Sequence, residues 1–244
     1  MRTQQTSAIA TISVLAFLLA ACDGTPPVTS VEHELAYSSS AKMLGPDVCA
    51  PGQPFSLVSS NSYFPLTVGS WWELAGEEDG ETIRLRIDIL NQIEMVGGVA
   101  TRVLKETEWV DGVLAEESYN YFAENGDGVA CYFGEAVDIF QNGMVSHEGS
   151  WRADEAGNAP GVFMPAEPLP GTMFQMEVAP GVAEDQGKIV GTGAVTVPAG
   201  TFAKTIRVRE LNPLDAGKDY KWYAAAVGII VDGPLRLTSY LVVP

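Results

Sequence analysis

The stretch Thr82-Ile83-Arg84-Leu85-Arg86-Ile87-Asp88-Ile89 places an apolar residue at every second position and a polar residue between them. This alternation is typical of a β-strand with one face on the core and the other in water. The same period recurs along the chain after residue 62. We expect further strands in the runs Val99–Trp109, Ser118–Ala123, Val129–Phe133, Gly187–Val197, Lys204–Glu210, Asp219–Ala224, Gly228–Asp232 and Leu235–Val243.

Short turn signals separate these runs, for example EEDG at 77–80, VDG at 110–112 and ENGDG at 124–128. Closely spaced strands joined by such turns favour antiparallel pairing between neighbours. No run of ten residues after the N-terminal segment has a helical period. We therefore predict an all-β fold, an antiparallel meander closed as a barrel or a β-sandwich and similar to a lipocalin.

The chain also contains an internal repeat. SYNYFA (118–123) and DYKWYA (219–224) share the pattern Tyr-x-aromatic-aromatic-Ala. A similar strand precedes each motif and follows a glycine, Gly98 in one copy and Gly200 in the other. We expect two similar half-sheets, over about 82–133 and 187–232, folded face to face. A chance likeness is the alternative, because alternation by itself makes strands resemble one another.

The first 21 residues have the features of a signal peptide. Arg2 is followed by an apolar run, Ala8 to Ala21, that is too short to span a bilayer. The run ends in Leu19-Ala20-Ala21-Cys22, which resembles the lipobox of bacterial lipoproteins. In that class the cysteine is acylated, the chain is cut before it, and the lipid holds the protein at the membrane. The alternative is an ordinary secretory signal with a chance cysteine.

The residues after Cys22 bear on location and domain organisation. Asp23 resembles the signal that retains lipoproteins of enteric bacteria in the inner membrane, on the extracytoplasmic side of the cell envelope. Residues 23–61 are rich in Pro and Ser and poor in periodic apolar positions, which is typical of a flexible tether. We expect a signal peptide over 1–21, the lipidated cysteine and tether over 22–61, and a single β domain over 62–244.

Four motifs run through the β region: YFPL at 63–66 with Gly69 and Trp71 after it, EGSW at 148–151, VPAGTF at 197–202, and WYA at 222–224 with VG at 227–228. Together they resemble an uncharacterised family of secreted and lipid-anchored bacterial β proteins. Relatives in that family usually have Thr at the position of His147 and an aromatic residue at that of Cys131. The resemblance implies an extracytoplasmic setting and supplies no mechanism.

The charge of the chain excludes some classes of partner. There are 31 Asp and Glu against 14 Lys and Arg, for a formal net charge of -17. A protein that binds nucleic acid without sequence preference needs a basic face to displace counterions, so we exclude that class. The single long apolar run, at the N-terminus, excludes a protein with several membrane-spanning helices. We interpret most of the acidic residues as solvated surface.

Few side chains suit catalysis or metal binding. His33 and His147 are too few for a multi-histidine metal site, and we predict no metal and no cofactor. His147 beside Glu148 has the groups of a general base, which supports an alternative function as an extracytoplasmic hydrolase or lyase. A surface loop is the simpler interpretation. The ENGDG turn at 124–128 lacks the length of a calcium-binding loop, so we interpret it as a hairpin turn.

Cys49 and Cys131 remain once Cys22 is assigned to the lipid. In an extracytoplasmic protein, two such cysteines favour a disulfide over a metal pair. The alternative is one buried thiol and one solvated thiol.

Aromatic residues are the remaining candidates for a binding site. Because strands alternate between faces, only about half of them can enter the interior. Tyr121, Tyr132, Trp151 and Trp222 are our candidates to line a cavity for an apolar or amphipathic ligand. Plain core packing is the alternative. We predict a non-enzymatic, lipid-anchored envelope protein that binds such a ligand or scaffolds an envelope protein.

Overall fold

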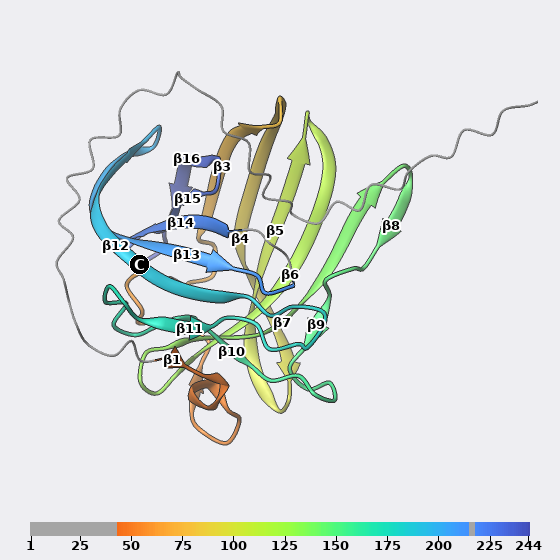
Figure 1. Ribbon diagram of the computed structural model, residues 1–244, viewed down its shortest axis with the longest axis vertical. Helices are drawn as coiled ribbons and strands as arrows, with labels where there is room; N and C mark the ends of the chain where they lie inside the picture. The colour runs from red at the N-terminus through yellow and green to blue at the C-terminus, as the bar shows by residue number, and fades with distance from the viewer. Residues whose placement is uncertain (1–42, 215–217) are drawn as a thin grey trace, which may run out of the picture.

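The computed structural model describes residues 43–214 and 218–244 (Figure 1). Within them no helix is long and apolar enough to span a membrane. The predicted all-β class is confirmed, because the one helical element is a single 3-10 turn, η1 (Pro46–Cys49). The strands are β1 (Met43–Leu44), β2 (Phe55–Ser56), β3 (Trp71–Glu78), β4 (Glu81–Val96), β5 (Val99–Val110), β6 (Val113–Asn125), β7 (Ala130–Gln141), β8 (Met144–Ser146), β9 (Trp151–Arg152), β10 (Gly161–Met164), β11 (Met173–Gln175), β12 (Gln186–Val197), β13 (Gly200–Leu211), β14 (Lys218–Ala224), β15 (Gly228–Asp232) and β16 (Leu235–Leu241).

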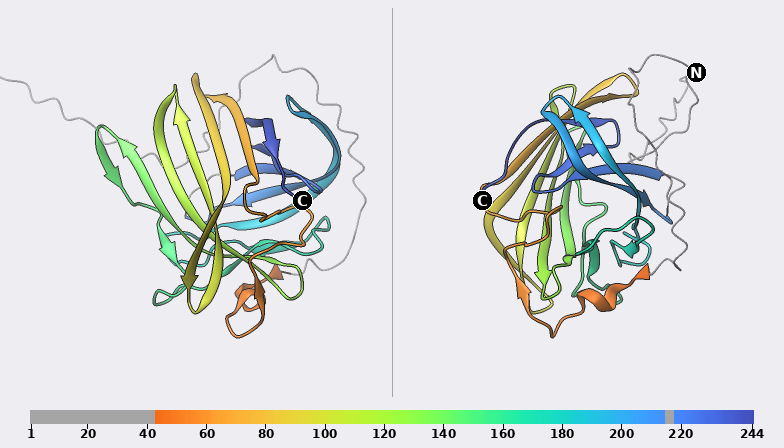
Figure 2. Two further views of the ribbon diagram at one scale, coloured as in Figure 1. Left: turned by 180° about the vertical axis from the view of Figure 1, so that it is seen from behind. Right: turned by 90° about the vertical axis from the view of Figure 1, so that its left-hand side faces the viewer.

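The strands form one sheet in which most chain neighbours pair antiparallel, as predicted. Hydrogen bonds connect them in the order β1-β11-β12-β13-β14-β15-β16-β3-β4-β5-β6-β7-β10, with β2 on β6 and with β8 and β9 on β7. Two meanders of four strands dominate, β4–β7 and β12–β15, and they are joined through β16 and β3. Figures 1 and 2 show β12, β13 and β14 running across the long strands β4–β7. The sheet therefore curls over itself and encloses the core.

The predicted closed barrel is not observed. Over the described residues the ladder ends at β10 on one side and at β1 and β11 on the other. These ends touch through an isolated bridge between Ala159 and Val178 and through a close approach at Gly161, where a Cβ would lie 1.9 Å from the Met176 carbonyl oxygen. The segment before β11 is rich in proline, which has no backbone N–H to donate to a ladder, so β11 stays short.

The predicted repeat falls on the two meanders. Residues 82–133 span β4 to the start of β7, and residues 187–232 span β12 to β15. The Tyr-x-aromatic-aromatic-Ala motif lies on the third strand of each meander, β6 in one and β14 in the other. The two halves therefore bring the same motif to corresponding places in the sheet.

Residues 43–61 are folded onto the β domain, whereas the sequence predicted that they belong to the tether. The structure joins Cys49 to Cys131 of β7 by a disulfide. Phe55 of β2 packs edge-on against Phe133, with 5.3 Å between ring centroids. Composition could not predict this attachment, because the partners lie on β7, with a sequence separation of 82 for the two cysteines. The rest of the predicted tether, Cys22 and the signal peptide lie outside the described residues.

A buried carboxylate on β6 completes the attachment of this segment. Glu124 accepts hydrogen bonds from Ser59 Oγ at 2.7 Å, from Ser60 N and Oγ at 2.7 Å each, and from Asn61 N at 2.9 Å. Charge-assisted bonds of this kind are the strong ones in proteins. The chain from 59 to 61 is thereby held at the end of the first meander.

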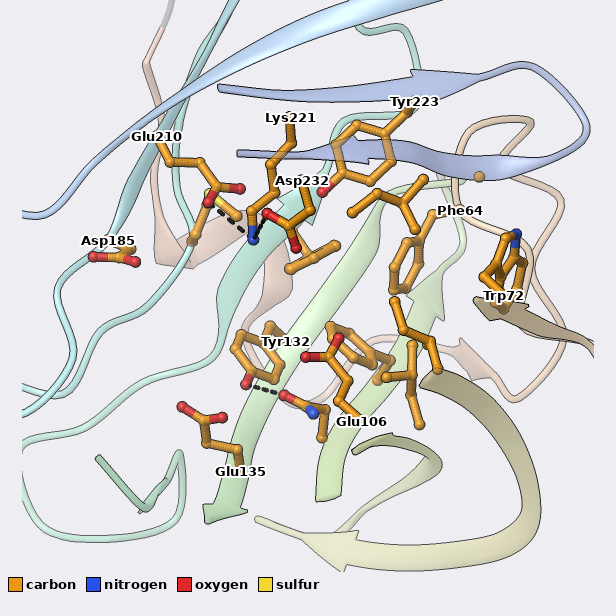
Figure 3. A pocket seen from close by; sticks show the side chains of 18 of the residues that line it. Phe64, Trp72, Glu106, Tyr132, Glu135, Asp185, Glu210, Lys221, Tyr223 and Asp232 are labelled. Atoms are coloured by element: carbon orange, nitrogen blue, oxygen red, sulfur yellow. Dashed lines mark hydrogen bonds and ion pairs between the residues drawn. The ribbon is translucent and has the colours of Figure 1, made fainter. Parts of the chain in front are cut away.

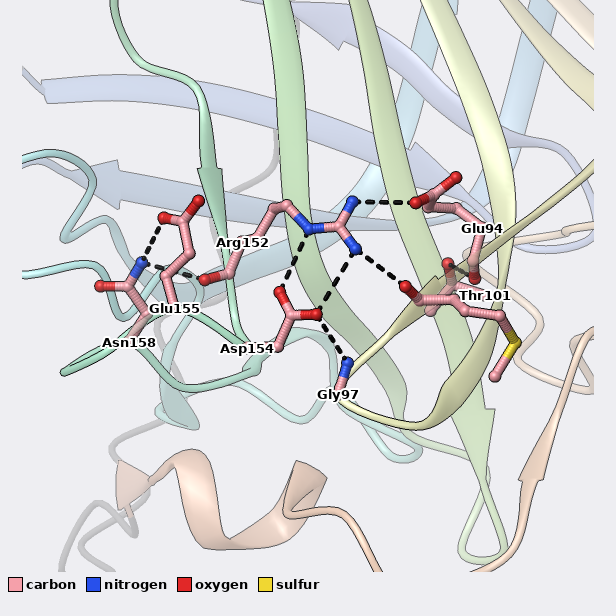
Figure 4. A network of polar contacts seen from close by, with 8 residues as sticks. Glu94, Gly97, Thr101, Arg152, Asp154, Glu155 and Asn158 are labelled. Carbon is pink, nitrogen blue, oxygen red and sulfur yellow. Dashed lines mark hydrogen bonds and ion pairs between the residues drawn. The ribbon is translucent and has the colours of Figure 1, made fainter.

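An ion-pair network holds the segment around β9 against the hairpin between β4 and β5 (Figure 4). Arg152 Nη1 lies 2.9 Å from Glu94 Oε1, and its Nε lies 3.1 Å from Asp154 Oδ1. The adjacent Trp151 is 1% exposed and packs edge-on against Tyr132, with ring centroids 5.3 Å apart. The network therefore keeps the large, buried side chain of Trp151 behind Tyr132, a residue that lines a cavity in the interior.

Candidate functional site

A partly open cavity of about 180 Å³ lies between the two meanders. If each water needs roughly 10–15 Å³ of such volume, the cavity has room for on the order of ten water-sized groups. Both meanders, β3 and β10 contribute to its wall. Its lining residues include Phe64, Trp72, Ile87, Leu104, Glu106, Asn120, Phe122, Tyr132, Glu135, Phe163, Met176, Glu177, Asp185, Glu210, Lys221, Tyr223, Ile229 and Asp232.

One part of the wall is aromatic. The Phe64 ring lies 4.8 Å from that of Phe122 and 4.6 Å from that of Phe163, measured between centroids. Trp72 lies on the same side as Phe64 in Figure 3, and its Nε1 donates a hydrogen bond of 2.6 Å to the Val227 carbonyl oxygen. The polar atom of the indole is thus satisfied by backbone. This side offers an apolar surface to a ligand.

The rest of the wall is acidic, whereas the sequence predicted that most acidic residues lie on the solvated surface. Six carboxylates and one lysine line the cavity. Figure 3 shows labelled charged groups on two opposite sides of the cavity. One side has Glu210, Lys221 and Asp232; the other has Glu106 and Glu135; the remaining carboxylates are Glu177 and Asp185.

The register of the strands shows that the two meanders present equivalent positions to the cavity. When the motif residues Tyr119 and Tyr220 are aligned, Asn120 of β6 corresponds to Lys221 of β14. The ladder to the next strand shifts register just after each of them, between Asn120 and Phe122 in one meander and between Trp222 and Tyr223 in the other. The correspondence therefore extends to an irregularity of the backbone.

The neighbours of these two residues correspond as well. Asn120 pairs across the sheet with Glu135, and Lys221 pairs with Asp232. On the preceding strand, Glu106 pairs with the residue before the first motif tyrosine and Glu210 with the residue before the second. Each meander thus presents two carboxylates on either side of a central residue, which is Asn120 in the first meander and Lys221 in the second.

The lysine of the second meander is held by both of its flanking carboxylates. Lys221 Nζ lies 3.2 Å from Glu210 Oε2 and 3.3 Å from Asp232 Oδ1. Burial by itself would lower the pKa of Lys221, but Asp232 and Glu210 outweigh that effect and raise the pKa well above its usual value. The lysine therefore stays charged, and its charge is compensated inside the second meander.

The carboxylates of the cavity hold their protons to unusually high pH. Burial raises the pKa of Glu106 and of Glu210 to about 7, against a partial lowering by Lys221. Burial, together with repulsion from Glu106, raises the pKa of Glu135 to about 8. Each side chain touches the cavity, but protein surrounds the cavity on its other sides, so desolvation dominates. Groups with such perturbed pKa values inside a cavity indicate a candidate functional site.

Of the four aromatic candidates from the sequence, Tyr132 lines the cavity. Tyr121 and Trp222 do not, because their strand neighbours Phe122 and Tyr223 take the inward positions and alternation sends adjacent side chains to opposite faces. Trp151 is buried behind Tyr132 instead of facing the cavity. The sequence thus predicted the aromatic strands correctly but misassigned most of the inward positions.

The catalytic candidates lie outside the cavity. The side chain of His147 is 71% exposed, and its Nδ1 lies 2.8 Å from Asp138 Oδ1. Glu148 is exposed beside it. The structure therefore does not bring either residue to the cavity carboxylates. His33, the other histidine, lies outside the described residues.

Metal-binding geometry is also not found in the described parts of the chain, where no group of three or more His, Cys, Asp or Glu side chains is arranged to hold a metal ion. The turn considered for calcium is a hairpin turn, as predicted. Asn125 Oδ1 accepts hydrogen bonds of 3.0 Å from the backbone N–H groups of Asp127 and Val129, so the asparagine oxygen serves the turn itself.

An inward carboxylate could have been detected in the sequence by its position in the alternation. Glu106 stands two residues after Leu104, which also lines the cavity, so the two share one face of β5. A charge at an inward position is uncommon and calls for a partner. That Glu177 and Asp185 join it could not be read from the sequence, since both lie outside the regular strands.

No family model matches the chain, and no curated protein matches it. The family resemblance drawn from the sequence motifs is therefore not confirmed. The chain is similar to one solved structure, described as a "putative lipoprotein" from Parabacteroides distasonis, with 14% identity and a TM-score of 0.31 over 74% of this chain and 99% of that chain. A likeness at this identity and TM-score carries no argument about function.

Proposed function

We propose that the protein is a lipid-anchored protein of the cell envelope, and that its β domain binds a small amphipathic ligand in the interior cavity. The lipobox-like Leu19–Cys22 supports the anchor. The cavity carries the binding function, because an aromatic wall that faces convergent polar groups is typical of ligand sites. A protein that only scaffolds a partner has no need of such a space in its core.

The size of the cavity restricts the ligand. Room for on the order of ten water-sized groups suits a compact molecule with about that many non-hydrogen atoms, and is too small for a two-chain lipid. The ligand that we propose is therefore smaller than an envelope lipid. It has an apolar part for the side with Phe64 and Trp72 and a polar part for the carboxylates.

The lipid anchor is tested by membrane fractionation of the Cys22→Ser variant in a bacterial host. We expect the wild-type protein in the membrane fraction and labelled by a radioactive or alkyne fatty acid, with the label absent from Cys22→Ser. An unlabelled wild-type protein, or a variant labelled to the same extent, would contradict the anchor.

The binding function is tested by native mass spectrometry of the protein purified in detergent. We expect a bound species of a few hundred daltons or less. Ile229 lines the cavity, so the matched variant Ile229→Trp adds volume there and should lose the bound species while it keeps its β circular dichroism spectrum. A bound species retained by Ile229→Trp would place the ligand elsewhere.

A further inference from the structure

In the second meander, an ammonium group already lies between two carboxylates. Lys221 Nζ lies within 3.3 Å of carboxylate oxygens of both Glu210 and Asp232. In the β13–β14 ladder Glu210 pairs with Asp219, two residues before Lys221, so it is a diagonal neighbour of the lysine. In the β14–β15 ladder Asp232 pairs with Lys221 directly. Two carboxylates on the strands that flank β14, Glu210 on β13 and Asp232 on β15, therefore accommodate an ammonium group in the cavity wall.

The first meander repeats the two carboxylates without the ammonium group. Its central residue is Asn120, whose Nδ2 donates to Ser118 Oγ at 3.0 Å and whose Oδ1 accepts from the Tyr132 hydroxyl at 2.5 Å. Asn120 is thus occupied and uncharged. Within the described chain, Glu106 and Glu135 form no ion pair with a Lys, Arg or His side chain, in contrast to Glu210 and Asp232.

Unpartnered oxygen atoms in the same cavity indicate that hydrogen-bond donors are needed there. Glu210 is 9% exposed and lines the cavity, and its Oε1 is buried with no hydrogen-bond partner. Asp185 Oδ1, also in the cavity wall, is buried and unpartnered too. An unpaired buried carboxylate oxygen is costly, and each calls for a donor. A ligand with several N–H groups would supply them.

We propose that the cavity binds a small organic cation, and that the ammonium group of this ligand lies between Glu106 and Glu135, where the first meander lacks a counterpart of Lys221. This inference rests on the proposed function, because it names the class of ligand for the same cavity. Lys221 does not oppose it, since its charge is compensated by Glu210 and Asp232. The apolar part of the ligand lies against Phe64, Trp72 and other rings of the aromatic side, which also attract cations.

Binding of a cation to these carboxylates is coupled to proton release. Because the pKa of Glu106 is raised to about 7 and that of Glu135 to about 8, both are largely protonated at pH 6. A cation binds best to the ionised pair, so its affinity rises with pH until both are ionised. The titratable and charged groups that face this pair, or act on it from the surrounding strands, are Glu108, Glu116, Tyr132, Glu177, Asp185, Glu210, Lys221, Tyr223 and Asp232.

The test compares three probes of the same shape and different charge: 2-phenylethylamine, 2-phenylethanol and phenylacetate. The full lipidated chain is titrated in neutral-detergent micelles by isothermal titration calorimetry, and protein-free micelles serve as the blank. At pH 8 the amine is still cationic, and we expect it to bind at least about tenfold more tightly than the alcohol. At pH 6 we expect that preference to fall by about tenfold, as the carboxylates bind protons.

Two variants test the position of the ammonium group. Asn120→Lys places a side-chain ammonium where the first meander has none, and Glu135→Gln removes one of the two carboxylates. Both should bind the amine no more tightly than the alcohol at pH 8. Glu81→Gln removes an exposed carboxylate on β4 and should keep the preference of the wild-type protein. If Asn120→Lys fails to fold, Glu135→Gln alone decides the outcome.

The outcomes separate this inference from the proposed function. If the amine and the alcohol bind equally, or phenylacetate binds more tightly, the cation is overturned while a ligand cavity remains. If none of the three binds, and no small ligand is found bound by native mass spectrometry, the cavity function itself fails. If calcium ions displace the amine from the wild-type protein but not from Glu135→Gln, the carboxylates form a metal site instead, which overturns the organic cation.

Discussion

Replacing Glu106 by glutamine should stabilise the protein, and by an amount that depends strongly on pH. Glu106 lies on β5 in the wall of the cavity, where burial raises its pKa from 4.5 to about 7. At pH 8 the folded protein carries a partly buried, desolvated carboxylate there, and Glu106→Gln removes that charge. At pH 5 the native side chain is already protonated, so the substitution changes little.

The stabilisation expected from Glu106→Gln has a sign and a size that follow from the linkage between folding and proton binding. Between pH 4.5 and 7 the folded state keeps the Glu106 proton while the unfolded state has lost it, so the free energy of unfolding falls as pH rises through this window. Each pKa unit corresponds to about 1.4 kcal/mol, so the full effect is about 3 kcal/mol above pH 7. For a domain of this size that is a change in Tm of roughly 6 to 12 °C.

The assay is thermal unfolding followed by circular dichroism at pH 5 and pH 8.5, with Glu81→Gln as the matched control. We expect the Tm of Glu106→Gln to exceed that of the wild-type protein at pH 8.5 and to equal it within about 2 °C at pH 5. The exposed Glu81 variant should follow the wild-type protein at both values. An equal gain at pH 5 and pH 8.5, or a loss at pH 8.5, would refute the desolvated, destabilising charge.

Two further predictions concern the attachment of residues 43–61. The double variant Cys49→Ser/Cys131→Ser opens a loop with a sequence separation of 82, and should lower the free energy of unfolding by about 4 kcal/mol; an unchanged urea midpoint, or two free thiols titrated in the unfolded wild-type protein, would contradict the bond. Glu124→Gln keeps the shape of the carboxylate that accepts from residues 59–61 but removes its charge, and should cost about 2 kcal/mol. Limited proteolysis should then cut the chain near residue 58 faster, and resistance equal to that of the wild-type protein would show that the contact is dispensable.

The positions of most strands could be predicted because alternation is a local property. The expected run Val99–Trp109 is observed as Val99–Val110, and Gly187–Val197 as Gln186–Val197. Successive side chains of a strand point to opposite faces, so the face of each residue follows from that of its neighbours. Glycine-containing turns between the runs then favoured antiparallel pairing between consecutive strands.

The irregular segments could not be predicted, because distant residues hold them in place. Residues 43–61 look like a tether by composition, yet Glu124 and Cys131 bind them to the far end of the first meander. The short strands β8, β9 and β10 lie in a stretch with no alternation, and all three pair with β7. Pairing with β7 therefore holds these short strands in place.

The candidate site, like the fold, could be predicted from the sequence only in part. The period of a strand is enough to place two similar aromatic motifs on two strands, and to put Glu106 on the same face as Leu104. That these strands face each other across one cavity, with Lys221 on one side and Glu106 and Glu135 on the other, depends on the tertiary structure. Desolvation and charge pairing depend on distances between strands that are far apart in the chain, and these distances exist only once the sheet has curled over itself.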